Sequence, residues 1–122
     1  MFSIHFVDED DNFVTAAWGL RGKKIYKDVF YQHQPLPTLM SAIIQKQSRP
    51  NSIFLLIKRH REFVYLFSAA SFIILTLRFG WIGVAMAGIY ELSKFSLLGN
   101  LFLAETFVVP LVLYLTGVIW EL

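Results

Sequence analysis

The sequence contains no cysteine, and charged residues are scarce. The absence of cysteine excludes disulfide frameworks, thiolate metal sites and cysteine nucleophiles. Charged residues make up 16% of the chain, against about 25% in a typical soluble protein. The net charge of +2 is too small to indicate nucleic-acid binding. Hydrophobic residues make up 56%, which indicates that part of the chain lies in lipid.

The few charges are concentrated in the first half of the chain. Eight of the eleven Lys and Arg and five of the nine Asp and Glu lie within the first 59 residues. Beyond them, residues 63–77 and 79–90 carry no charge, and residues 95–120 contain one acidic residue, Glu105. A helix that crosses a bilayer needs about 20 predominantly apolar residues. We therefore predict a mainly α membrane protein with its spans in the C-terminal half.

The apolar runs predict a two-span transmembrane helical hairpin. We expect one helix over residues 62–89, a turn over residues 90–95 and a second helix over residues 96–120. Each helix is slightly longer than a bilayer core requires, so some tilt is expected.

A competing arrangement has three short spans, with turns at residues 78–80 and 99–100. It would place Glu91 and Lys94 deep in lipid. An ion pair between them at i,i+3 offsets part of that cost, but a wet loop costs less, so the hairpin is favoured.

Residues 1–52 are predicted to form a small, irregular α+β segment. The expected elements are a strand at Phe2–Val7, a polar turn at Asp8–Asn12, strands at Phe13–Leu20 and Lys24–Tyr31, and a helix at Thr38–Gln47. A segment of about 50 residues buries little surface and is marginal alone. We therefore expect it to dock on a soluble or membrane partner.

Residues 53–61 are predicted to form an interfacial basic segment, with Ser52 as a helix N-cap. Its basic cluster is Lys58, Arg59, His60 and Arg61, which we expect to contact phospholipid headgroups or to set orientation. Basic flanks stay on the matrix or cytoplasmic side of a membrane. A two-span hairpin would return both termini to that side.

Arg78 and Glu105 are the charges expected within the spans. If the turn centres near residue 92, both lie about 20 Å from it, because a helix rises about 1.5 Å per residue. Charges at this depth are rarely left unpaired, so we predict a structural ion pair between them. A proton or ion path through Glu105 is the alternative.

Small residues and one proline indicate where helices pack. Gly80, Gly83 and Gly88 belong to a small-residue stretch that permits close helix approach. Pro110 interrupts the second helix and removes the hydrogen-bond donor for the Thr106 carbonyl.

No motif indicates catalysis, a cofactor or a metal. The run from Asp8 to Asn12 begins like a calcium loop, but Phe13 stands where a glycine is needed and Gly19 where a glutamate is needed. The histidines His5, His33 and His60 do not form a pair at metal-ligand spacing. We read the run as an acidic turn.

In general anatomy, the chain resembles the small accessory subunits of multisubunit membrane complexes. This resemblance implies a non-catalytic scaffold that contacts other integral membrane subunits, in a respiratory or ATP-synthase assembly of the mitochondrial inner membrane. Two alternatives remain open. One is a homo-oligomeric channel that uses Arg78 and Glu105, and the other is a secretion-machine component of a bacterial inner membrane.

Overall fold

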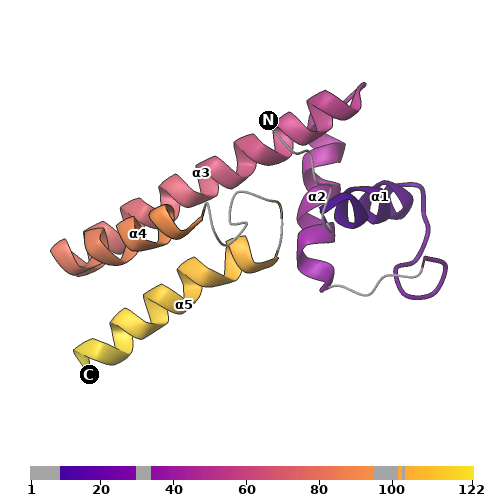
Figure 1. Ribbon diagram of the computed structural model, residues 1–122. Helices are drawn as coiled ribbons and strands as arrows, with labels where there is room; N and C mark the ends of the chain where they lie inside the picture. The colour runs from indigo at the N-terminus through magenta and orange to yellow at the C-terminus, as the bar shows by residue number, and fades with distance from the viewer. Residues whose placement is uncertain (1–8, 30–33, 95–101, 103) are drawn as a thin grey trace. The chain divides into compact units, whose positions relative to one another are not determined.

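The structure is a computed structural model, and it describes residues 9–29, 34–94, 102 and 104–122. Within these residues the chain forms five helices and no strand (Figure 1). The helices are α1 (Glu9–Leu20), α2 (Pro35–Ser48), α3 (Ile53–Phe79), α4 (Trp81–Ser93) and α5 (Ala104–Glu121). The chain divides into unit 1, Met1–His60, and unit 2, Arg61–Leu122, so α3 contributes its first turns to unit 1 and the remainder to unit 2.

The predicted α+β character of residues 1–52 is wrong. The expected strand at Phe13–Leu20 is the larger part of α1. Its buried residues Asn12, Phe13 and Ala16 recur at helical rather than alternating spacing. The described part of the expected acidic turn instead opens α1, because carboxylates at Asp10 and Asp11 favour the positive N-terminal end of a helix dipole.

The other expected strands are not found in the described part of unit 1. Of the strand at Lys24–Tyr31, the described residues retain an isolated bridge between Ile25 and Val29. The expected strand at Phe2–Val7 lies outside the described residues. The helix expected at Thr38–Gln47 is present as α2, and the Leu55 N–H donates to Ser52 Oγ at 3.2 Å, as expected for an N-cap.

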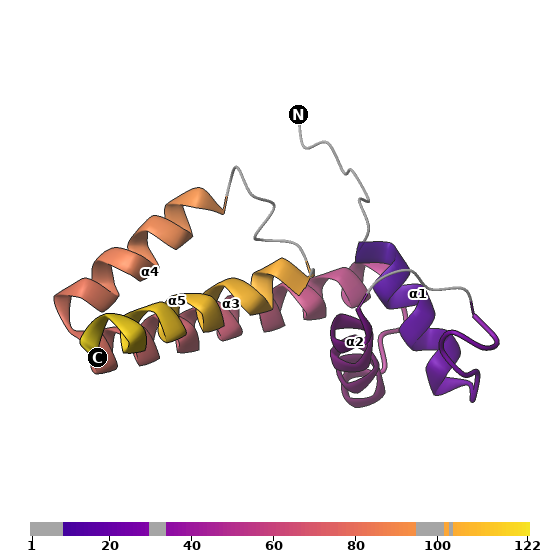
Figure 2. The same cartoon turned by 90° about the horizontal axis from the view of Figure 1, so that it is seen from below.

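In unit 1, α1 packs against α2 (Figure 2). Phe13 and Ala16 of α1 are buried, as are Thr38 and Ser41 of α2. Thr38 Oγ1 donates to Asn12 Oδ1 at 3.3 Å across the two helices. The buried side chains of Thr38 and Asn12 therefore satisfy each other across the interface, as most buried polar groups are satisfied.

The single helix predicted over residues 62–89 is two helices in the structure. α3 ends at Phe79, and α4 begins at Trp81 after Gly80, whose φ is +57°. Glycine adopts this left-handed region without the steric cost that a side chain imposes. Gly83 lets α4 fold back closely, since a Cβ there would lie 2.0 Å from the Leu75 carbonyl oxygen.

The predicted antiparallel hairpin is also wrong, because α5 runs in the same direction as α3 (Figures 1 and 2). Near the start of α5, the ring centroid of Phe107 lies 5.2 Å from that of Phe67. Further along α5, the ring centroid of Tyr114 lies 5.6 Å from that of Phe79. α4, which lies between α3 and α5 in the sequence, runs in the opposite direction to both (Figure 1). The predicted turn over residues 90–95 falls largely within α4, which continues to Ser93.

Among the described residues, α3 and α5 are the helices long and apolar enough to cross a membrane. Each carries charges about one span apart. Arg61 and Arg78 are separated along α3 by about 26 Å, and Glu105 and Glu121 along α5 by about 24 Å, at about 1.5 Å per residue. These distances approach the thickness of a bilayer core, about 30 Å.

Candidate functional site

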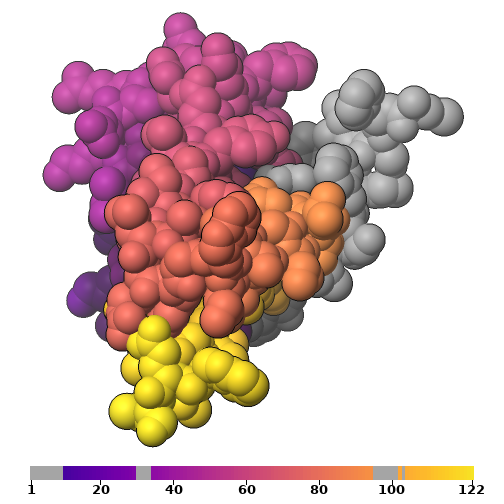
Figure 3. All heavy atoms as spheres, turned by 90° about the vertical axis from the view of Figure 1, so that its left-hand side faces the viewer, coloured from indigo at the N-terminus to yellow at the C-terminus, as the bar shows by residue number. Residues whose placement is uncertain are grey.

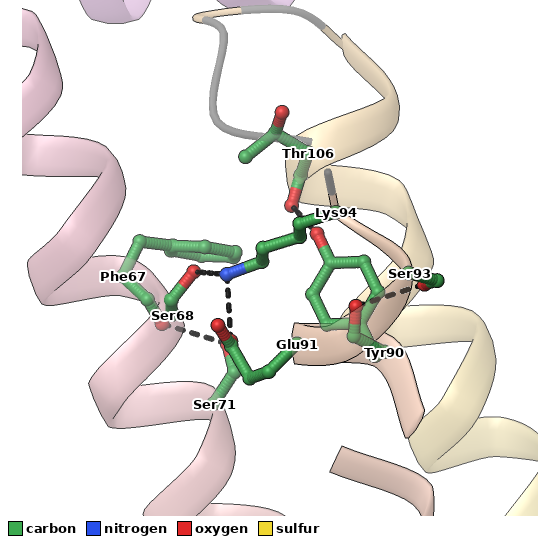
Figure 4. Close-up of polar contacts among 8 residues, drawn as sticks. All are labelled: Phe67, Ser68, Ser71, Tyr90, Glu91, Ser93, Lys94 and Thr106. Atoms are coloured by element: carbon green, nitrogen blue, oxygen red, sulfur yellow. Dashed lines mark hydrogen bonds and ion pairs between the residues drawn. The ribbon is translucent and has the colours of Figure 1, made fainter. Parts of the chain in front are cut away.

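A buried lysine joins the helices of unit 2. Lys94 caps the C-terminal end of α4, and its side chain is 3% exposed. Its ammonium group donates to Ser68 Oγ on α3 and to Glu91 Oε1 at 2.6 Å, and it lies 4.9 Å from the centroid of the Tyr90 ring (Figure 4). An ammonium group has three donors. Two hydrogen bonds and one cation–π contact therefore compensate the buried charge.

Local sequence positions each partner of Lys94. Glu91 precedes it by three residues, which places both side chains on one face of α4. Ser68 comes from the middle of the apolar part of α3, seven residues after Arg61 and ten before Arg78. Those separations correspond to about 10 and 15 Å along the helix. The cluster thus lies near the middle of the apolar stretch.

Tyr90 links this cluster to α5. Its hydroxyl donates to the Thr106 carbonyl oxygen at 3.3 Å. That carbonyl stands four residues before Pro110, which has no N–H to donate. The tyrosine hydroxyl thus donates to a carbonyl whose i+4 residue is a proline, and the contact lies in a buried environment.

Two further serines form bonds within their own helices. Ser71 Oγ donates to the Phe67 carbonyl and Ser93 Oγ to the Tyr90 carbonyl, each at 2.8 Å (Figure 4). Such bonds to a preceding turn satisfy a hydroxyl without a partner helix. Ser68 differs from these two serines, because its hydroxyl oxygen accepts a hydrogen bond from Lys94 of another helix.

Glu91 also borders a groove on α3. The groove has a volume of about 360 Å³ and is lined by Tyr65, Ser68, Ala69, Phe72, Ile73 and Glu91. The Glu91 side chain is 42% exposed, whereas Lys94 is enclosed. The Glu91 carboxylate thus accepts a hydrogen bond from Lys94 and is also exposed to the groove.

The structure pairs Arg78 with Glu121 rather than with Glu105. Arg78 Nη1 donates to Glu121 Oε1 at 3.1 Å and Nη2 to Oε2 at 2.5 Å. Because α3 and α5 run in parallel, the last turns of both helices meet, while Glu105 lies exposed in the first turn of α5. The predicted ion pair between Arg78 and Glu105 is wrong, because it requires α3 and α5 to be antiparallel.

The basic cluster does not act as one surface. Lys58 and Arg59 are exposed and Arg61 is partly buried, but His60 is 1% exposed within unit 1. Its Nε2 lies 2.8 Å from Ser41 Oγ and its Nδ1 2.8 Å from the Leu56 carbonyl, and its ring packs 4.3 Å from Phe13. The predicted headgroup contact is therefore wrong for His60, which lies in the core of unit 1.

The predicted packing residues have different roles. Gly83 touches the α3 backbone, and Pro110 is buried within α5. At Gly88, by contrast, a Cβ would meet nothing within 4 Å. Sequence reasoning missed Gly117, where a Cβ would lie 2.6 Å from the Phe79 ring.

A comparison of the chain with protein-family models, curated proteins and solved structures finds no match. The sequence signal for the cluster is the i,i+3 spacing of Glu91 and Lys94. The predicted hairpin instead places both residues in a wet loop.

Proposed function

We propose that this chain is an integral membrane protein that acts as a non-catalytic accessory subunit of a larger membrane assembly. The observation that carries the proposal is the compensated Lys94. In a bilayer, a buried cation is tolerated when it is paired. Here its partners come from α3 and α4, and Tyr90 extends the contacts to α5. The charge holds helices together, as a scaffold requires.

The parallel course of α3 and α5 supports a specific topology. A chain that crosses through both helices in the same direction must return between them. Residues before α3 and residues after α5 then lie on opposite sides of the membrane. We assign the side of Lys58 and Arg59 to the matrix or cytoplasm, because basic flanks stay there. This proposal replaces the expectation that both ends share one side.

The outer faces of the two helices support contact with lipid or other membrane subunits. Large apolar side chains are exposed on both, including Leu66 and Leu77 on α3 and Leu115 and Ile119 on α5. We assign the assembly to the mitochondrial inner membrane, as a respiratory or ATP-synthase complex, on the basis of size and anatomy. The same physical features suit a bacterial inner membrane.

Native electrophoresis with mass spectrometry tests the accessory role. The native membrane is solubilised in mild detergent, and the particle that contains this chain is sized and its companions are identified. Migration in a large particle with fixed companions supports the proposal. Migration as a homo-oligomer contradicts it.

A homo-oligomeric transport element is the second candidate, and the half-exposed Glu91 is the observation that favours it. A carboxylate that borders a groove near the middle of the apolar stretch could line a path between copies. Purified protein in liposomes would then conduct ions, and Glu91→Gln would abolish the flux. Absence of flux from the wild-type protein removes this candidate.

A further inference from the structure

An apolar cleft lies at the end of unit 2 where α3 passes into α4 and where α5 ends, the end that faces the viewer in Figure 3. Its volume is about 300 Å³, and it is lined by Phe79, Ile82, Met86, Thr116, Gly117, Trp120 and Glu121. This volume is at the lower end of the range of small-molecule sites. Gly117 leaves room for the Phe79 ring that forms one wall.

The edge of this cleft carries both signs of charge. Glu121 lines the cleft and binds Arg78 through two hydrogen bonds. The side chains of Arg78 and Glu121 are 47% and 40% exposed, so both ions remain accessible. A guanidinium has five N–H donors and a carboxylate about four acceptor sites. Two of each are used in the pair, which leaves both ions free to bind further partners.

Aromatic residues place this charged edge at the level of headgroups if α3 and α5 span the membrane, as the proposed function holds. Trp120 and Trp81 are 83% and 87% exposed and lie at the C-terminal end of α5 and the N-terminal end of α4, respectively. Exposed tryptophan is typical of the membrane–water interface. The cleft would then open toward the acyl chains and its charged edge toward the headgroups.

We propose that this cleft binds a phospholipid with an ethanolamine headgroup. An acyl chain occupies the apolar cleft, the phosphate accepts hydrogen bonds from Arg78, and the ammonium group donates to Glu121. The neutral pair of opposite charges matches a zwitterionic headgroup, whereas a glycerol headgroup offers no cation. A choline headgroup has no N–H and cannot donate to the carboxylate, so ethanolamine is preferred.

Native mass spectrometry of the full chain released from nanodiscs tests this site. The nanodiscs contain equal parts of phosphatidylethanolamine, phosphatidylcholine and phosphatidylglycerol with identical acyl chains. We expect one retained lipid, enriched in phosphatidylethanolamine by about tenfold, the effect of one charged hydrogen bond. Glu121→Gln should remove this enrichment. Met86→Trp, which fills the cleft, should abolish retention, while Ile89→Trp at an exposed α4 position outside the cleft should not.

The outcomes separate this site from the proposed membrane integration. Carbonate extraction of the same preparation reports integration independently of lipid retention. An integrated protein that retains no lipid, or prefers phosphatidylglycerol, overturns the ethanolamine site and leaves integration intact. Equal retention by Met86→Trp and wild type also overturns the site. Release of the protein by carbonate overturns the membrane proposal itself.

Discussion

The Tyr90 hydroxyl donates to the Thr106 carbonyl, and Pro110, four residues after Thr106, has no N–H to donate. The proline and the tyrosine are thereby coupled through one oxygen atom. The hydrogen bond from α4 thus reaches α5 at the turn that precedes its proline.

Tyr90→Phe should destabilise unit 2 by about 0.5–1.5 kcal/mol, because a buried carbonyl loses a donor. In a Pro110→Ala background the helix regains its N–H, so the same substitution should cost less. Unfolding of the four proteins in mixed micelles measures this coupling. An equal penalty in both backgrounds would show that the tyrosine does not compensate for the proline.

Lys94→Met should destabilise unit 2 by about 1–3 kcal/mol, because Ser68 and Glu91 lose a charged hydrogen-bond donor and the Glu91 carboxylate loses its counter-ion. The double variant Lys94→Met, Glu91→Gln should recover part of this loss because no charge remains. Lys23→Met, at an exposed position in unit 1, is the control and should have little effect. Unfolding in mixed micelles measures the stability of these variants. Equal stability of the Lys94 and Lys23 variants would contradict a structural role for the cluster.

Two glycines of α4 should respond in opposite ways to alanine. Gly83→Ala should be strongly destabilising, because its Cβ would lie 2.0 Å from the Leu75 carbonyl oxygen, a backbone atom. Gly88→Ala meets nothing within 4 Å and should stabilise α4 by up to about 1 kcal/mol through helix propensity. Thermal stability in detergent measures both. A harmless Gly83→Ala would contradict the close fold-back of α4 on α3.

Ser41→Ala should destabilise unit 1 by about 1–3 kcal/mol, because it removes the hydroxyl bonded to the buried His60. Ser41 Oγ also accepts from Gln45 Nε2 at 3.0 Å, so two polar side chains lose a partner. Ser48→Ala on the same helix is the matched control, since Ser48 bonds back to the Ile44 carbonyl. If the two variants unfold alike in denaturant, His60 does not depend on Ser41.

The apolar character of α3 and α5 could be predicted from residues alone, as could α2 and the cap at Ser52. Hydropathy and helix caps are local signals, so one sequence carries them. The strand prediction for α1 is wrong, because it depends on a pairing of Phe2–Val7 with Phe13–Leu20, while the acidic residues Asp10 and Asp11 between them open a helix.

The course of unit 2 could not be read from hydropathy. A glycine turn at Gly80 and a charged turn near Glu91 both fit the apolar runs, and the cost of burying charge favours the charged turn. The deciding contacts are tertiary. Ser68 and Tyr90 compensate Lys94, and the approach of Ser68 from α3 depends on Gly83, a predicted packing residue whose partner helix only the folded chain reveals.

The side of the membrane on which each end of the chain lies tests the central claim most directly. Because the chain has no cysteine, single variants Lys23→Cys and Leu122→Cys can be labelled with a membrane-impermeant maleimide in sealed, oriented vesicles. Lysed vesicles provide the control for reactivity. The parallel course of α3 and α5 predicts that one position is labelled in sealed vesicles and the other only after lysis. Labelling of both from the same side would contradict it and restore the antiparallel hairpin.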